Sequence, residues 1–149
     1  MSRITDLWRA GIAPARDGLY RADGSSRGVE VDGASLSWFD LGAPLDLDAL
    51  LAEDPDDVTE IDIHPQGFAE LPDGSGRVCC GEGAHGSEGF FARLDPDEHL
   101  VWIVSLRHSN PFERVTVDGT RAIFTNNLGN TVTVDLASPE FGPASTAAQ

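Results

Sequence analysis

The stretch "RHSNPFERVTVDGTRAIFTNNLGNTVTVDL", residues 107–136, has the clearest strand pattern in the chain. Short runs rich in β-branched residues are separated by Asp118-Gly119 and by the Asn/Gly cluster at residues 126–130. An Asp-Gly pair between two such runs is a strong signal for a tight β-hairpin. We therefore predict three or four neighbouring antiparallel strands here, and we expect them to serve mainly as scaffold.

The segment before this stretch predicts a central strand. Residues 100–106, "LVWIVSL", are apolar without alternation, which is typical of a strand covered on both faces. Further upstream, alternating patterns and turn residues predict more short strands. They lie at residues 18–22, 29–31, 36–41, 58–64, 67–80 (a hairpin around Asp73-Gly74) and 90–94.

Two short helices complete the expected fold. Ile4, Leu7 and Trp8 form one apolar stripe in residues 4–11, and Leu47, Leu50 and Leu51 form another before Pro55. Asp46 or Asp48 is placed to cap the second helix. The fold class is therefore α+β: a mostly antiparallel sheet, strongly curved or in two layers, with two short helices. We expect one globular domain over residues 1–137 and a flexible C-terminal tail over residues 138–149.

Composition limits the class of protein and its cellular compartment. A chain of 149 residues is long enough to bury a core without a staple. No apolar run is long enough to span a bilayer, and residues 1–18 lack the apolar core of a signal peptide. The cysteines, Cys79 and Cys80, are neighbours, and a bridge between them closes no useful loop. We expect reduced thiols and a cytoplasmic protein.

Charge is the strongest compositional feature. The formal net charge is −15, and all ten basic residues are arginine. No arginine lies between Arg27 and Arg77, a segment that holds 13 of the 25 acidic residues. Nucleic acid and anionic membranes are disfavoured partners, because both are bound by clustered cations. Adaptation to salt or a GC-rich genome explains general acidity, but neither removes arginine from one block.

The acidic block has two interpretations. One is a solvated helix face that keeps the protein soluble. The other is a surface that meets a basic partner, because complementary charge speeds encounter and disfavours wrong partners. The carboxylates of this candidate partner-binding surface are Asp40, Asp46, Asp48, Glu53, Asp54, Asp56 and Asp57. The aromatic pair Trp38 and Phe39 precedes them. Neighbouring strand residues point to opposite faces, so we expect one of the two to be core and the other to face solvent as an anchor.

Sites for catalysis or metals are less well supported. The acidic runs lack the glycine and distal glutamate of a calcium loop, and no Cys or His pair has zinc spacing. Cys79 or Cys80 is a candidate for a thiolate–imidazole pair with His85 or His108, but nothing local favours such a pair. We expect Cys79 and Cys80 to be buried at a strand edge and residues 81–89 to form a loop. We predict no catalytic residue, no metal and no cofactor.

In size, net charge, segregated acidic block and lack of a catalytic motif, the chain resembles the small acidic cytoplasmic immunity proteins that neutralise bacterial toxins. The segments "LVWIVSLRHSNPF" and "TNNLGNTVTVDL" are similar to parts of uncharacterised bacterial proteins of this kind. The resemblance implies a non-enzymatic inhibitor that occludes a basic toxin domain. The alternatives are an accessory domain with a small-ligand pocket on the concave face of its sheet, and a small Cys/His-dependent enzyme.

Overall fold

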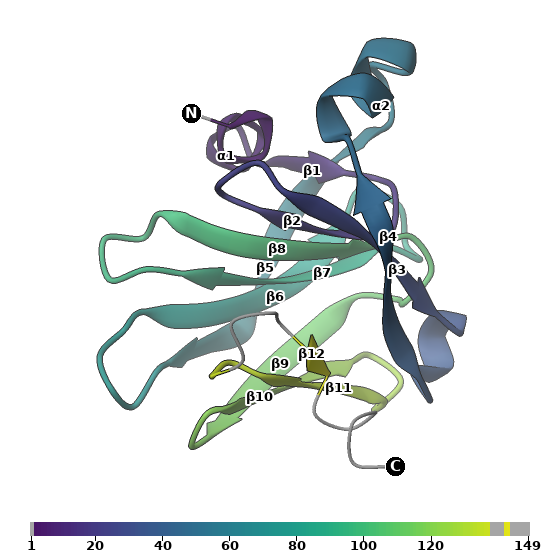
Figure 1. The fold of residues 1–149 in the computed structure, drawn as a ribbon. Coiled ribbons are helices and arrows are strands. Elements are labelled where there is room, and N and C mark those ends of the chain that lie inside the picture. Colours follow the sequence, from purple (N-terminus) through teal and green to yellow (C-terminus); the bar gives the residue numbers. More distant parts are fainter. Residues whose placement is uncertain (1, 138–141, 144–149) are drawn as a thin grey trace.

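The computed structural model describes residues 2–137 and 142–143, and within them two antiparallel sheets carry most of the chain (Figure 1). The larger sheet contains, in spatial order, β1 (Ile12–Pro14), β5 (Val58–Glu70), β6 (Arg77–Gly83), β7 (Gly89–Leu94), β8 (Leu100–Leu106), β2 (Gly18–Arg21), β3 (Ser26–Val31) and β4 (Phe39–Leu45). The smaller sheet contains β12 (Gly142–Pro143), β11 (Thr131–Asp135), β10 (Arg121–Asn126) and β9 (Phe112–Asp118). The helices are α1 (Arg3–Arg9), α2 (Leu47–Glu53) and the short 3-10 turn η1 (Gly33–Ser35). Mostly antiparallel strands with two short α-helices confirm the expected broad class.

The smaller sheet is built from the stretch that opened the sequence analysis. β9 and β10 form a hairpin in which Asp118 faces Arg121, and Gly119 supplies the positive φ of 61° that the turn requires. β10 then pairs with β11 in continuous register. The prediction of three or four neighbouring antiparallel strands over residues 107–136 is confirmed, with three strands observed. Most of the predicted tail lies outside the described residues, except that Gly142–Pro143 pairs with β11 as β12.

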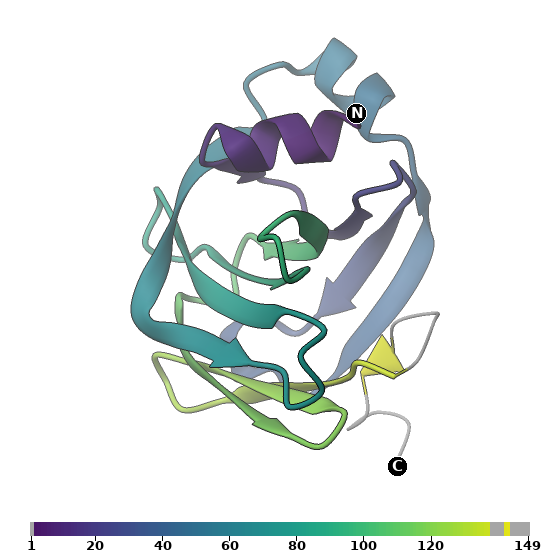
Figure 2. The same ribbon diagram turned by 90° about the vertical axis from the view of Figure 1, so that its left-hand side faces the viewer.

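Both faces of the central strands of the larger sheet, β6, β7, β8 and β2, are covered. Along β7, Phe91 packs into the core shared with the smaller sheet, whereas its neighbours Phe90 and Ala92 pack into the core beneath the helices. Figures 1 and 2 show α1 on one side of the larger sheet and the smaller sheet on the other. The rings of Phe91 and Phe124 stack at 4.3 Å between centroids and join the two sheets. β8 lies between β7 and β2 and is almost wholly buried, as predicted for residues 100–106.

The helices begin and end close to the predicted positions. Asp46 caps α2, since its side chain accepts a hydrogen bond from the backbone N–H of Ala49 at 3.1 Å. Leu47 and Leu51 are the buried residues of α2. The helix projects from the body of the molecule at the end of β4 (Figure 1).

One long strand replaces two predicted ones. β5 runs without a break through Pro65 and Gly67, where the sequence predicted a strand end and the start of a separate hairpin. The pairing of β5 with β6 is irregular between Ile63 and Phe68, which accommodates these two residues. A Cβ at Gly67 would lie 2.5 Å from the carbonyl oxygen of Cys80, so this position needs glycine for close approach. β1 pairs only with the first residues of β5, so Pro65 lies where no partner on that side needs its N–H.

Candidate binding edge

The nine predicted partner-binding residues lie on β4, on α2 and in the turns that flank them (Figure 1). β4 is one of the two edge strands of the larger sheet, and α2 follows it directly. We call this part of the surface the β4–α2 edge. It consists of the exposed residues among the nine: Trp38, Asp40, Asp46, Asp48, Glu53, Asp54 and Asp56. Because β4 separates Trp38 from α2, the edge is elongated and the aromatic residue lies at one end.

Trp38 and Phe39 point in opposite directions. Phe39 is 2% exposed and packs against Phe91, with 6.2 Å between ring centroids. Trp38 is 42% exposed. One of the two is thus core and the other faces solvent, as expected: Phe39 belongs to the core, and Trp38 is the aromatic residue of the edge.

The loop before Trp38 is held by Asp32. The sequence predicted a strand from residue 36, but η1 and three further residues precede β4, which begins at Phe39. The Asp32 carboxylate accepts hydrogen bonds from the backbone N–H and hydroxyl of Ser37 and from the hydroxyl of Ser35. These bonds, the one from Ser37 first, lower the pKa of Asp32. Leu36 adopts a left-handed φ of 52° and is buried, which fixes the path of the loop.

A second set of bonds ties this loop to the smaller sheet. The side-chain amides of Asn126 and Asn130 both donate to the carbonyl oxygen of Ala34, at 2.8 and 2.9 Å. Asn126 also accepts from the backbone N–H groups of Leu128 and Asn130. The Asn/Gly cluster thus serves as a clamp on the loop that presents Trp38.

Asp40 has a second carboxylate directly beside it. The register of β3 and β4 places Glu30 opposite Asp40, and both side chains are exposed. Next to this pair is a groove of about 440 Å³. Its lining includes Glu30, Gly28 and Gly42, together with Arg16, Asp17, Arg107 and His108.

The acids of α2 are largely free of cations. Asp48 lies 3.6 Å from the guanidinium of Arg3, and both side chains are well exposed. Asp46, Glu53, Asp54 and Asp56 have no ion pair with any described residue. Glu53 is the last residue of α2 and Asp54 its C-cap, a place where negative charge opposes the helix dipole.

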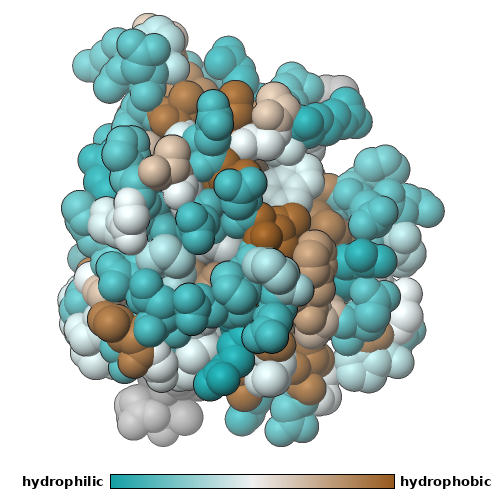
Figure 3. Space-filling view, turned by 180° about the vertical axis from the view of Figure 1, so that it is seen from behind, coloured by the Kyte–Doolittle hydropathy of each residue, from teal (hydrophilic) through white to brown (hydrophobic). Residues whose placement is uncertain are grey.

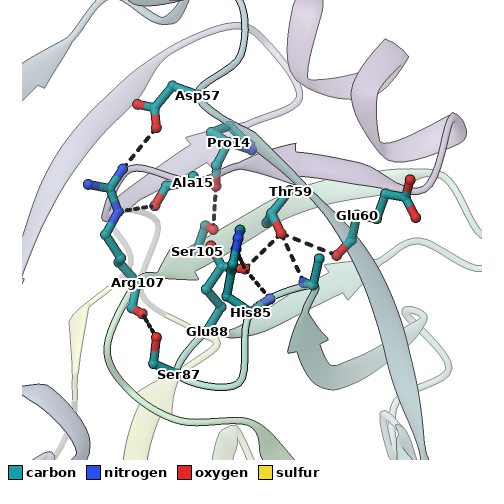
Figure 4. A network of polar contacts seen from close by, with 11 residues as sticks. Pro14, Ala15, Asp57, Thr59, Glu60, His85, Ser87, Glu88, Ser105 and Arg107 are labelled. Atoms are coloured by element: carbon teal, nitrogen blue, oxygen red, sulfur yellow. Dashed lines mark hydrogen bonds and ion pairs between the residues drawn. The ribbon is translucent and has the colours of Figure 1, made fainter.

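Asp57 does not belong to this surface. Its carboxylate receives a hydrogen bond from the guanidinium of Arg107 at 2.9 Å, and Arg107 also donates to the carbonyl oxygen of Ala15 (Figure 4). The backbone N–H of Arg107 donates to Asp17 at 2.6 Å. Asp57 therefore joins the start of β5 to the loop before β2 and to the end of β8. Because the carboxylate is paired with Arg107 and half-buried, we leave Asp57 out of the β4–α2 edge.

A buried acidic residue escaped the sequence analysis. Glu88 is 5% exposed and accepts hydrogen bonds from the hydroxyl of Thr59 at 2.7 Å and from the backbone N–H of His85 at 3.1 Å (Figure 4). Burial raises the pKa of Glu88, but the hydrogen bonds from Thr59 and His85 and the nearby His85 ring outweigh it, so the net pKa is lowered. The loop expected at residues 81–89 is shorter than predicted, because residues 81–83 belong to β6 and Gly89 begins β7, and Glu88 anchors the remaining residues 84–88 to β5.

The thiol–imidazole hypothesis finds no support in the geometry. Cys79 and Cys80 lie on β6, which has a strand on each side, so they are not at a sheet edge as predicted. Both are free cysteines and fully buried. Burial raises the pKa of each thiol to about 12, with a contribution from Cys80 at Cys79. Thiols in this state are poor nucleophiles at neutral pH.

One group of potential metal ligands was also missed. Asp95, Asp97 and His99 bring their ligand atoms within 4.8 Å of one another in the turn between β7 and β8. One oxygen of Asp95 accepts from the backbone N–H groups of Asp97 and His99, which lowers the pKa of Asp95. This arrangement accounts for the cluster as a side-chain-stabilised turn.

Large exposed hydrophobic residues are few and separated. Among the described residues they are Trp38, Phe68 and Leu128. Figure 3 shows the back of the molecule, where a band of apolar atoms runs between hydrophilic margins. Phe68 lies on β5, six strands away from β4 in the order of the larger sheet.

No helix in the described part of the chain has the length and apolar character needed to cross a membrane. No protein-family model, curated protein or solved structure matches this chain.

Proposed function

We propose that this chain is a non-enzymatic binding protein, an inhibitor of the immunity type, that covers a basic surface of a partner protein with its β4–α2 edge. The observation that carries the proposal is that three exposed carboxylates at the end of α2 and in the turn after it, Glu53, Asp54 and Asp56, have no ion pair with any described residue. A charged surface of this kind speeds association with a partner of opposite charge and disfavours wrong partners.

The stability of α2 gives independent support. Glu53 and Asp54 at its C-terminal end oppose the helix dipole, and the last turn contains no basic residue. Acids at this position therefore cost stability. A binding surface requires these acids, whereas a helix with a purely structural role does not require them.

The mechanism is occlusion. α2 projects from the body of the protein, so its acids reach a basic cleft before the rest of the surface does (Figure 1). The partner is expected to be an enzyme domain, such as a toxin, whose cleft is lined by lysine and arginine. We place the inhibitor in the cytoplasm, which suits its two reduced thiols.

The other two hypotheses receive less support. A pocket on a concave face of the larger sheet conflicts with the packing there, since β6, β7, β8 and β2 contribute side chains to a core on each face. A cysteine-dependent enzyme conflicts with the burial of both thiols.

An inhibition assay tests the proposal. The basic proteins encoded next to the gene are purified, and their enzymatic activity is measured with and without this chain. We expect one of them to be inhibited, and we expect Glu53→Lys/Asp54→Lys/Asp56→Lys to lose most of that inhibition. A control with the same net charge, Asp97→Lys/Glu113→Lys/Asp118→Lys, changes exposed acids elsewhere and should retain it. Equal inhibition by both triple variants, or no basic partner that binds, would overturn the proposal.

A further inference from the structure

The groove of about 440 Å³ lies where the ends of β8 and β2 meet the β3–β4 pair. Its volume falls within the range of small-molecule sites, roughly 300–1,000 Å³. In the register of the sheet, Gly18 at the start of β2 faces Ser105 of β8 on one side and Gly28 of β3 on the other. Arg16 lies just before β2 and Arg107 just after β8, so the sheet brings both arginines to the groove that Gly28 also lines.

The backbone around Arg16 is held in place on several sides. The carbonyl oxygen of Arg16 accepts a hydrogen bond from the Tyr20 hydroxyl at 2.7 Å. That of Ala15 accepts from Nε of Arg107 at 3.2 Å (Figure 4), and the N–H of Ala15 donates to the carbonyl oxygen of Asp57 at 3.0 Å. The Arg16 side chain, in contrast, is exposed and forms no ion pair with any described residue. A fixed backbone therefore presents an unpaired guanidinium to the groove.

Arg107 and His108 add further donors to the same lining. The Arg107 guanidinium uses Nε and Nη2 for Ala15 and Asp57, whereas its Nη1 makes no hydrogen bond or ion pair with a described residue. Asp17 also lines the groove, but its carboxylate already accepts the backbone N–H of Arg107 at 2.6 Å. Two arginines and a histidine thus gather at one groove of a chain whose formal net charge is −15.

The rest of the lining is apolar apart from Glu30. It consists of Gly28, Val29, Gly42, Ala43 and Leu45, from β3 and β4. A Cβ at Gly42 would lie 3.8 Å from Oε2 of Glu30, so this carboxylate lies beside the glycine floor. The groove therefore matches a ligand with one anionic end and an apolar body, and Glu30 disfavours a second negative charge on that ligand.

We infer that this groove is a binding site for a small organic monoanion, a carboxylate with a short apolar body. The Arg16 guanidinium and Nη1 of Arg107 donate to the carboxylate, and the body of the ligand lies against the glycines and Leu45. Hydrogen bonds between a guanidinium and a carboxylate are charge-assisted and stronger than neutral ones. The inference is independent of the proposed function, because no residue of the β4–α2 edge lines this groove.

Titration of the full isotope-labelled chain, followed by NMR chemical shifts at pH 7 and constant ionic strength, tests the site. The probes are benzoate, its neutral analogue benzamide and inorganic phosphate. We expect saturable binding of benzoate with shifts of the Gly28 and Gly42 amides. Benzamide and phosphate should each bind about tenfold more weakly, the first because it lacks the charge and the second because it carries too much of it. Absence of saturable benzoate binding, or equal binding of benzamide or phosphate, would overturn the inference.

Two charge-neutralising variants should change benzoate affinity in opposite directions. Arg16→Gln should weaken binding about tenfold through loss of a charge-assisted bond, whereas Glu30→Gln should strengthen it about twofold to threefold through loss of repulsion. Arg121→Gln and Glu113→Gln make the same changes in net charge at exposed positions of the smaller sheet, and should leave the affinity unchanged. Thermal unfolding of each variant confirms that it is folded. An Arg16→Gln variant that binds as Arg121→Gln does, or weaker binding by Glu30→Gln, would contradict the site.

Discussion

At the scale of single residues, Glu88 connects a loop to the sheet. Its pKa is lowered, so the ionised form is favoured in the folded protein. The stabilisation is therefore present above the usual value of 4.5 and is lost as the pH falls through the lower folded value. We expect Glu88→Gln to cost about 1–3 kcal/mol of unfolding free energy at pH 7, since Thr59 and His85 lose a charged acceptor.

Thermal unfolding as a function of pH checks this expectation. The difference between wild type and Glu88→Gln should be constant near neutrality and should shrink below pH 4.5. Glu82→Gln, an exposed acid on the neighbouring strand, is the control and should change little. A difference that stays constant down to strongly acidic pH would show that the charge of Glu88 contributes nothing.

The cysteines provide a second test at this scale. Because burial raises the pKa of both thiols to about 12, little thiolate forms at neutral pH. We expect a thiol reagent to modify Cys79 and Cys80 only as fast as the protein opens, and rapidly in denaturant. Fast modification of one thiol in the folded protein would reinstate the enzyme hypothesis.

At the scale of elements, α2 combines a stabilised start and an unfavourable end. Asp48 lies in the first turn, near Arg3, whereas Glu53 ends the helix. We expect Glu53→Lys to raise the free energy of unfolding by about 0.3–1 kcal/mol and Asp48→Lys to lower it by a similar amount. Chemical denaturation measures both. If Glu53→Lys and Asp48→Lys change the free energy of unfolding in the same direction, the helix dipole does not explain the cost of the acidic end.

The strands that the sequence predicted well are those with local signals. Asp118-Gly119 between β-branched runs identified the β9–β10 hairpin without any knowledge of distant contacts. β5 was divided in error because Pro65 and Gly67 are local breakers, whereas an unpaired edge and the close approach of Cys80 make them acceptable. Local sequence patterns also miss contacts between distant residues at the candidate site. Asp57 is paired with Arg107, 50 residues away, and Glu88 with Thr59, 29 residues away, so no local pattern reveals either bond.

At the scale of the whole molecule, two buried cores stabilise the fold and an acidic edge is left as binding surface. The central strands of the larger sheet are covered on both faces, so binding surface is left at its edge strand β4, its loops and the projecting α2. The arginine-free segment supplies that strand and helix together, which is why the charge block predicted most of the edge. The sequence did not show that the edge is elongated, because the lengths and directions of β4 and α2 depend on tertiary packing.

The rate of association with the basic partner, measured by stopped flow over a salt series, tests the central claim most directly. The comparison is between Glu53→Lys/Asp54→Lys/Asp56→Lys and the control Asp97→Lys/Glu113→Lys/Asp118→Lys, which have the same net charge. At roughly 20 mM salt, where screening is weak, we predict that the edge variant associates at least about tenfold more slowly than the control, and that the two rates converge near 500 mM, roughly the range where screening is strong. Equal rates for the two variants at low salt would contradict the account, because net charge rather than the β4–α2 edge would then govern encounter.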